Sequence, residues 1–315
     1  MVEYRKIYDS ALKTADLRFQ DLSTWQLISL ANEERDRQTG TRFELCSITN
    51  AKSGRCSEDC KFCAQSAHYN TNAPVFPLKS KEELLEEAHK AKDIGAQRFS
   101  IVTSGKGATP KEIETIAEVV SAIKEKIGII PCASLGVLDT KSLGLLKDAG
   151  LSRYHHNIET SPEFYPEIVT THTFEDRLKT IRAAKEVGLE VCSGGIIGLG
   201  ESEEDRIRMA LTLKDLEVDS VPINILVPLK GTPLEGAQTI SIADILRTIA
   251  IFRLILGDKT IRIVAGRESV LKDFQGLAFM AGANGMMIGG YLTVKGRSAE
   301  DDLAMVSELK KLWNG

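Results

Sequence analysis

Short runs of apolar and β-branched residues alternate along this chain with longer segments in which apolar positions recur every three or four residues. Runs of the first kind are typical of buried strands, and segments of the second kind are typical of amphipathic helices. The pattern predicts eight strands, at residues 43–48, 98–103, 129–135, 153–158, 190–195, 220–227, 260–264 and 285–288. It predicts a helix after each strand, at residues 81–94, 110–126, 140–148, 174–187, 203–216, 242–255, 268–280 and 299–312.

The predicted helices carry recognisable end signals. Three of them are followed by a glycine, at Gly95, Gly150 and Gly188, and a strand follows each glycine within a few residues. Glycine is the residue that most readily adopts the left-handed conformation that ends a helix. Ser202 precedes three acidic residues and is a candidate N-cap for the helix after the fifth strand.

Eight strand–helix units in series predict an α/β fold, a (β/α)8 barrel of the TIM type. A doubly wound open sheet is the main alternative, but no G-x-G-x-x-G motif follows the first predicted strand. Residues 1–40 are predicted to form a short N-terminal helical cap, and residues 41–315 the barrel. Because no linker or break in composition is visible, the sequence predicts a single domain over residues 1–315.

Composition narrows the class of protein. The 315 residues are 43% hydrophobic, which is ample for a large core, and the formal net charge of −4 gives no sign of a nucleic-acid partner or an anionic membrane surface. Six cysteines in this length do not make a disulfide scaffold. Met1–Arg5 has no apolar segment of a secretory signal, and no apolar run is long enough to span a bilayer. These features predict a cytoplasmic, reducing location.

The run from Cys56 to Cys63 carries most of the chemistry. It is a C-x3-C-x2-C triplet in which Phe62 precedes the third cysteine. Three thiolates suit three corners of an iron–sulfur cube, and without a fourth local ligand one iron stays open to bind a substrate or cofactor. The alternatives are a zinc knuckle or a disulfide pair. Structural zinc takes four ligands, typically in paired C-x2-4-C units, and no second pair lies near.

This triplet resembles that of the radical S-adenosylmethionine (SAM) superfamily. In that superfamily the open iron chelates the amino and carboxylate groups of SAM. The reduced cluster then breaks SAM into methionine and a 5′-deoxyadenosyl radical.

The other three cysteines, Cys46, Cys132 and Cys192, fall on the first, third and fifth predicted strands, and Arg262 falls on the seventh. In an eight-stranded barrel, one interior layer takes its side chains from alternate strands. The four residues can therefore converge on one spot inside the barrel. A buried cysteine is also an ordinary small hydrophobe, but three on odd strands beside an arginine favour a second metal site.

Five segments, in order, resemble biotin synthases, and the resemblance extends from about residue 25 to the C-terminus. They are residues 56–66, 154–161, 191–201, 220–224 and 265–268. The resemblance implies insertion of sulfur into dethiobiotin, between its methyl carbon and its ring-side methylene, with two SAM molecules consumed. It also implies that a sacrificial auxiliary Fe–S cluster supplies the sulfur. Members are usually homodimers, and the implied partners include a flavodoxin or ferredoxin electron donor and the Fe–S assembly machinery.

The resemblance also assigns roles to individual residues. The SAM cluster, a 4Fe–4S cluster with one open iron, is implied at Cys56, Cys60 and Cys63. The implied SAM contacts are Phe62, Asn157, Glu159, Arg177 and Ile197. Three ligands of the auxiliary cluster are implied at Cys132, Cys192 and Arg262. The implied dethiobiotin contacts are Asn224, which matches a residue that bonds the ureido ring, His155 and, near Lys295 in the loop after the eighth strand, Thr293.

The chain departs from the family at four positions. Ser100 stands where the family has a third auxiliary-cluster cysteine, while Cys46 and Gly285 stand where it commonly has serine and His155 where it has asparagine. A hydroxyl is a much poorer ligand for iron–sulfur chemistry than a thiolate. We therefore expect Cys46, Cys132 and Cys192 to hold the auxiliary cluster in a cavity enlarged at Gly285. A four-iron cluster with an extra sulfide is favoured, and a 2Fe–2S cluster that also uses Arg262 is the alternative.

Two other functions remain open at the level of the sequence. One is a related barrel enzyme with another substrate, such as a hydrogenase-cofactor maturase or a methylornithine-type mutase, which has no need of Asn224 together with the auxiliary thiolates. The other is an Fe–S carrier or redox-sensing scaffold without turnover. A carrier has no use for a pocket such as Asn157, Glu159 and Arg177 that binds a ribose and an amino acid.

Overall fold

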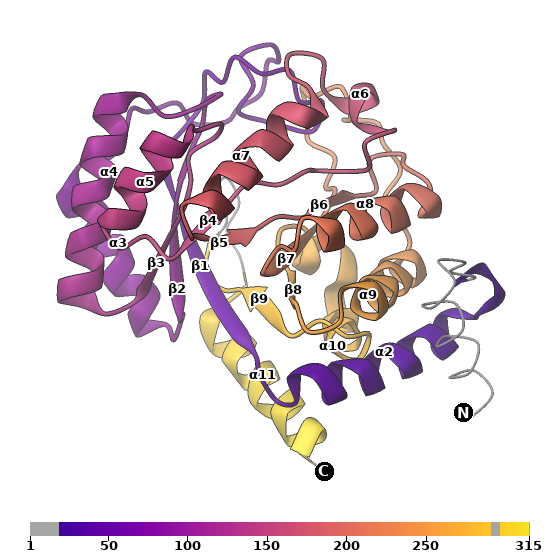
Figure 1. The fold of residues 1–315 in the computed structure, drawn as a ribbon. Coiled ribbons are helices and arrows are strands. Elements are labelled where there is room, and N and C mark those ends of the chain that lie inside the picture. The colour runs from indigo at the N-terminus through magenta and orange to yellow at the C-terminus, as the bar shows by residue number, and fades with distance from the viewer. Residues whose placement is uncertain (1–18, 291–296, 315) are drawn as a thin grey trace.

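The computed structural model describes residues 19–290 and 297–314 as a barrel of parallel strands surrounded by helices (Figure 1). The strands lie in the order β5-β4-β3-β2-β1-β9-β8-β7-β6, and a direct pairing of β5 with β7 closes the ring. This confirms the predicted (β/α)8 fold. The strands are β1 (Glu44–Lys52), β2 (Arg98–Thr103), β3 (Ile130–Ser134), β4 (Arg153–His155), β5 (Glu190–Cys192), β6 (Gly195–Ile197), β7 (Ser220–Ile225), β8 (Thr260–Ile263) and β9 (Gly285–Met287).

The predicted fifth strand is in fact two short strands, β5 and β6, separated by a bend at Ser193 and Gly194. A Cβ atom at Gly194 would lie 2.1 Å from the carbonyl oxygen of Pro222, and one at Gly195 would lie 2.1 Å from that of Glu159. Both glycines are therefore places where two backbones approach more closely than any side chain allows. The bend brings the chain against the segment that follows β4.

An outer ring of helices covers the strands (Figure 1). Its members are α3 (Lys81–Asp93), α4 (Pro110–Ala122), α5 (Thr140–Asp148), α7 (Phe174–Glu186), α8 (Glu203–Asp215), α9 (Ile242–Leu256), α10 (Gln275–Met280) and α11 (Ala299–Asn314), with a single turn, α6 (Tyr165–Ile168), before α7. Ser202 caps α8 as predicted, accepting a hydrogen bond from the backbone N–H of Asp205. Gly95, Gly150 and Gly188 all have positive φ angles. These predicted helix ends are confirmed.

The predicted helix at 268–280 is wrong as a single element. The structure has a π-helical turn at Arg267–Leu271, a 3-10 turn at Lys272–Phe274 and then α10. Lys272 has a φ of 48°, which no α-helix interior allows. The buried guanidinium of Arg267 binds the Asp302 carboxylate on α11. This ion pair with a later helix stabilises the turn. The local pattern of apolar residues gives no sign of the ion pair.

Part of the predicted N-terminal cap is described, as a 3-10 turn at Phe19–Asp21 and helix α2 (Thr24–Thr39). The helix crosses the end of the barrel opposite the cysteine loop and packs on α9 (Figure 1). Arg247 of α9 donates hydrogen bonds to the carbonyl oxygens of Phe19 and Leu22. Residues 1–18 lie outside the described residues, so the division into cap and barrel stays a prediction.

Side chains alternate between a helix-covered apolar layer and a polar barrel interior. On β2, Phe99 and Ile101 belong to the main hydrophobic core, whereas Ser100 lines an interior cavity. The same alternation separates Leu45 from Cys46 on β1. Because strand residues alternate faces, one register places all the chemistry inside the barrel. Within the described residues, no helix has the length and apolar character to cross a membrane.

Candidate active site

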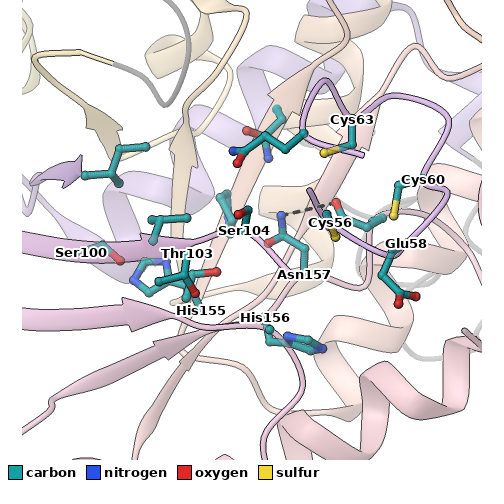
Figure 2. A pocket seen from close by; sticks show the side chains of 18 of the residues that line it. Cys56, Glu58, Cys60, Cys63, Ser100, Thr103, Ser104, His155, His156 and Asn157 are labelled. Atoms are coloured by element: carbon teal, nitrogen blue, oxygen red, sulfur yellow. Dashed lines mark hydrogen bonds between the residues drawn. The ribbon is translucent and has the colours of Figure 1, made fainter. Parts of the chain in front are cut away.

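A cavity of about 340 Å³ connects the cysteine triplet at the barrel mouth with the barrel interior. Cys56, Cys60 and Cys63 line one end of it, and Cys46 and Arg262 line the other. Figure 2 shows the separation: the three cysteines of the triplet lie together, while Ser100 and His155 lie on the far side of Asn157. The cysteine triplet therefore shares one cavity with Cys46 and Arg262 of the predicted interior site.

The triplet lies on the loop that follows β1, at the carboxyl ends of the strands, where barrel enzymes place their active sites. All six cysteines of the chain are free, so the disulfide alternative is wrong. No three His, Cys, Asp or Glu side chains among the described residues are grouped so as to hold one metal ion. A 4Fe–4S cluster does not need three side chains that share one metal ion, because each thiolate binds a different iron. Three free thiols around one cavity end fit that arrangement.

The thiols of the triplet are partly or fully buried. Burial raises the pKa of Cys60 to about 12, although the nearby Arg177 opposes the shift. Burial also raises the pKa of Cys63. Metal ligation requires thiolates, so binding of iron here must displace protons.

Two acidic residues inside the triplet anchor its loop to the segment before α7. The Asp59 carboxylate accepts hydrogen bonds from the backbone N–H groups of Thr170 (2.9 Å) and Thr171 (3.2 Å). Glu58 binds Nδ1 of His172 and accepts a bond from the Thr171 hydroxyl at 2.7 Å. Sequence analysis did not assign these roles. The sequence feature that could have indicated these roles is the pair of adjacent acidic residues between Cys56 and Cys60.

A polar wall beside the triplet is formed by Asn157, Glu159 and Arg177. The Asn157 side-chain amide donates to Glu159 Oε2 at 3.4 Å, and Arg177 Nη1 lies 3.7 Å from Glu159 Oε1. Burial raises the pKa of Glu159, while Arg177 acts in the opposite direction. Tyr165, which sequence analysis missed, accepts a hydrogen bond from Arg177 Nε at 3.1 Å and so orients the guanidinium.

Glu159 has a φ of 70°, a conformation that non-glycine residues rarely adopt. Hydrogen bonds hold it there: its N–H donates to the Gly194 carbonyl, and its carbonyl accepts from Ile196 N–H at 2.9 Å. Strained residues persist where the surroundings over-determine them, often at functional sites. The glycine bend between β5 and β6 therefore places the Glu159 side chain.

A second, more apolar cavity of about 350 Å³ adjoins the first. Phe62 and Asn224 line both, which places them between the two spaces. The Asn224 amide donates to the carbonyl oxygen of Gly195 at 3.2 Å. Ile197 was a predicted SAM contact, but its side chain lies in the apolar core, and Ile196 lines the second cavity instead. Thr293 and Lys295 lie outside the described residues.

The three remaining cysteines gather around Arg262, as the strand assignment predicted. Arg262 Nη2 donates to the sulfur of Cys192 at 2.6 Å, and its charge also acts on the thiols of Cys46 and Cys132. All three thiols are buried. Burial raises the pKa of Cys46 and raises that of Cys132 to about 11. Of these three cysteines, Cys46 lines the first cavity, whereas Cys132 and Cys192 do not.

Ser100 and His155 line the same interior space. The Ser100 hydroxyl and His155 Nε2 are both buried, and neither has a hydrogen-bond partner among the described residues. Burial, together with the positive charge of Arg262, lowers the pKa of His155 well below its usual value. Two orphaned polar groups that line one space are typical of a site that receives a polar ligand.

The expected enlargement of the cavity at Gly285 is wrong. A Cβ atom at this position would lie 2.7 Å from Cγ of Arg262 and 2.8 Å from the carbonyl oxygen of Glu44. The room that glycine leaves is filled by the stem of Arg262. Gly285 therefore determines the path of the arginine rather than opening an empty space.

Below the three thiols, charged side chains form the floor of the barrel. Glu44 lies 2.8 Å from Arg98 Nε and 2.7 Å from Arg153 Nη1. Glu190 lies 3.0 Å from Arg98 and 2.9 Å from Arg153. Burial would raise the pKa of Glu44, but Arg262 and Arg153 together lower it to about 2. Sequence analysis did not identify this floor.

Comparison with known families gives two matches that together span most of the chain. Residues 51–213 match the radical SAM superfamily, and residues 222–310 match the biotin and thiamin synthesis associated domain. The first match carries the cysteine triplet and the Asn157 wall. The second begins on β7 and carries Asn224 and Arg262.

Curated relatives agree over nearly their whole length. The chain is 57% identical over 273 residues to a biotin synthase of Thermotoga neapolitana, covering 86% of this chain and 98% of that protein. It is 54% identical to a biotin synthase of Thermotoga petrophila, covering 92% and 96%.

Solved structures share the fold at lower identity. A methylornithine synthase superposes with a TM-score of 0.77 at 24% identity, over 92% of this chain and 88% of that one. An FeFe-hydrogenase maturase from Carboxydothermus hydrogenoformans gives 0.79 at 19% identity, over 97% and 78%. At these identities the likeness establishes the barrel alone.

Proposed function

We propose a division of labour between two thiol sites for this chain, which belongs to the biotin synthase family of the radical SAM superfamily. The reaction is insertion of sulfur into dethiobiotin to form biotin, with SAM as the source of the radical. The observation that carries the division is the cavity that ends at the cysteine triplet on one side and at Cys46 and Arg262 on the other.

At the mouth, Cys56, Cys60 and Cys63 hold a 4Fe–4S cluster with one open iron. When bound there, the reduced cluster would supply the electron that cleaves SAM into methionine and a 5′-deoxyadenosyl radical. Arg177 is oriented by Tyr165 and pairs with the SAM carboxylate, because a guanidinium fork grips a carboxylate with two hydrogen bonds. The other SAM contacts are the ribose-binding pair Asn157 and Glu159 and, beside the adenine, Phe62.

In the interior, Cys46, Cys132 and Cys192 would hold the auxiliary cluster, which would supply the sulfide for insertion. A four-iron cluster with an extra sulfide is the favoured form, and the two-iron cluster with Arg262 as an additional ligand is the alternative. The gathering of three free, buried thiols around one guanidinium supports an anionic cluster in this place.

Dethiobiotin binds between the two sites. Asn224 lies where the two cavities meet, and its amide is suited to the ureido ring. His155, with an orphaned buried Nε2, is the second polar contact. A substrate held here has the mouth cluster on one side and the sulfur donor on the other. Such positioning brings two successive C–H abstractions and one sulfur source to a single molecule.

A flavodoxin or ferredoxin supplies the electron, the Fe–S assembly machinery rebuilds the spent cluster, and the chain forms a homodimer as family members usually do. A cytoplasmic location suits an enzyme with six free cysteines, because a reducing compartment keeps thiols available for iron.

Anaerobic incubation of the reconstituted protein with SAM, dithionite and dethiobiotin tests the proposal. The expected products are biotin, methionine and 5′-deoxyadenosine, with two deoxyadenosines for each biotin. Deoxyadenosine without biotin would point to a related barrel enzyme with another substrate. Absence of both products from protein with full iron and sulfide would point to a carrier.

A further inference from the structure

The interior thiols lie directly above a carboxylate that contacts three arginines. Glu44 is two residues before Cys46 on β1, and its carboxylate is close to Arg98, Arg153 and, through Nη1 at 3.5 Å, Arg262. The Glu44 side chain is only 15% exposed. No other carboxylate among the described residues pairs with all three guanidiniums.

Arg262 has a fixed place between this carboxylate and the sulfur above it. Its Nη2 donates to Cys192 Sγ at 2.6 Å. Its Nη1 forms an ion pair with the Glu44 carboxylate at 3.5 Å without a hydrogen bond, and its Nε has no hydrogen-bond partner among the described residues. Gly285 makes this path available, since a Cβ there would lie 2.7 Å from Arg262 Cγ. The position of the arginine therefore depends on two neighbours. The Glu44 carboxylate attracts its guanidinium, and Gly285 leaves room for its stem.

We propose that Glu44 is a positioning residue for the auxiliary centre: it holds Arg262 as an N–H donor to sulfur, so the protein ligands of the cluster are the three thiolates. This rests on the proposed function, because it assigns Cys46, Cys132 and Cys192 to that cluster. An arginine guanidinium has five donors and no acceptor, so a guanidinium paired with a carboxylate suits donation to sulfur better than ligation of iron. Hydrogen bonds to the sulfurs are among the factors that set the potential of an Fe–S cluster.

The floor itself provides a matched control. Glu190 pairs with Arg98 and Arg153 much as Glu44 does, but its side chain is 41% exposed. No pairing of Glu190 with Arg262 is present in the described structure. If the floor were only a structural ion-pair network, neutralising either glutamate would have the same kind of effect. If Glu44 positions Arg262, the two substitutions differ at the cluster.

The experiment compares wild type, Glu44→Gln, Glu190→Gln and Gly285→Ala, each as the full chain reconstituted anaerobically. Protein labelled with ¹⁵N in its arginines is examined by pulsed EPR of the reduced auxiliary cluster. Wild type should show a weak arginine coupling, as expected of a hydrogen bond. Glu190→Gln should keep that signal and its rate of biotin formation. Glu44→Gln should lose the signal and form biotin roughly 10-fold to 100-fold more slowly, the usual cost of removing a partner of a metal-site residue.

Gly285→Ala keeps the test decisive if Glu44→Gln fails to fold. It changes no charge but puts a methyl group against the arginine stem, so it should weaken the same signal. All variants should cleave SAM at the wild-type rate, because the mouth cluster is separate. A strong nitrogen coupling in wild type, as from an iron-bound arginine, would overturn the proposal. So would a signal and rate left unchanged by both Glu44→Gln and Gly285→Ala. A wild type that forms no biotin would instead count against the proposed function.

Discussion

The two groups of cysteines in this barrel differ in almost every physical respect. The mouth group lies within eight consecutive residues of one loop, and Cys56 and Cys63 are partly exposed. The interior group comes from three strands, β1, β3 and β5, and is fully buried. The mouth loop is anchored by Asp59 and Glu58 to the segment before α7, whereas the interior thiols lie on a floor of paired charges.

In the proposed function, the difference separates two chemical tasks. A cluster that must admit SAM needs one open face, and a loop at the carboxyl ends of the strands supplies it. A cluster that gives up a sulfide needs to be kept from water and from other acceptors, and the closed interior of the barrel supplies that. If the two sites are separate in this way, a substitution at one should leave the activity of the other intact.

The largest effect is expected at the mouth. Cys56→Ala, Cys60→Ala or Cys63→Ala should each reduce 5′-deoxyadenosine formation to background and abolish biotin formation, because each removes one corner of the cube. The loop lies outside the main hydrophobic core, so circular dichroism should report an unchanged fold. A normal deoxyadenosine yield from any of the three variants would contradict the assignment.

Substitution in the interior should break one activity and spare the other. Cys46→Ser should lose the auxiliary iron and form no biotin, because a hydroxyl is a poor replacement for a thiolate. It should still cleave SAM. Iron and sulfide analysis with a deoxyadenosine assay checks both halves. The assignment of Cys46 as a ligand would be wrong if an anaerobic structure of the wild-type protein placed its sulfur well beyond roughly 2.3 Å, the length of a metal–thiolate bond, from the nearest iron.

Between the sites, Asn224→Ala should weaken binding of dethiobiotin. An unpaired polar group costs roughly 1–3 kcal/mol, which corresponds to about 5-fold to 150-fold in affinity. Binding of SAM should change much less. Asn157→Ala is the matched control, because the same change on the mouth side should affect SAM more than dethiobiotin. Equal effects of both variants on both ligands would show that the subsites are not separate.

A smaller effect is expected at Tyr165, which does not line the cavity but accepts a hydrogen bond from Arg177, which does. Tyr165→Phe removes the hydroxyl that accepts from Arg177 Nε, so SAM should bind more weakly by about 0.5–1.5 kcal/mol. Tyr154→Phe makes the same chemical change where the hydroxyl bonds the Leu135 and Gly136 backbone. Titration of SAM into both variants should show a loss of affinity only in the first.

The same contrast explains what sequence could predict. The barrel and its cysteine triplet are local signals, because a spacing of three and two residues and a repeated strand–helix period are visible in one dimension. The inward placement of Cys46, Cys132 and Cys192 followed from strand phase alone. Exact strand ends did not, since the bend at Gly194 depends on a close approach to Pro222, 28 residues away in sequence.

Contacts between distant side chains were the part that sequence could not supply. The Glu44 floor joins four strands, and the path of Arg262 depends on Gly285, which sequence analysis interpreted as empty space. Ile197 and Ile196 differ by one position, and a strand turns one inward and the other outward. The role of Tyr165 depends on its contacts with Phe174 and Arg177 of α7, which are not visible in the sequence.

The smallest effect is expected at Ser100, and it tests whether the interior thiol has moved from β2 to β1. Ser100 lines the cavity, but its hydroxyl has no hydrogen-bond partner among the described residues. Deleting an unpartnered buried hydroxyl leaves nothing else unsatisfied, so the cost to stability should be small. Ser100→Ala should keep the auxiliary iron and most of the biotin-forming activity, whereas Cys46→Ser, a change of one atom on the neighbouring strand, should lose both. Iron content measured on the two variants side by side decides the matter. If Ser100→Ala loses iron and Cys46→Ser keeps it, the ligand lies on β2 and the interior site is not the variant form that Cys46 indicates.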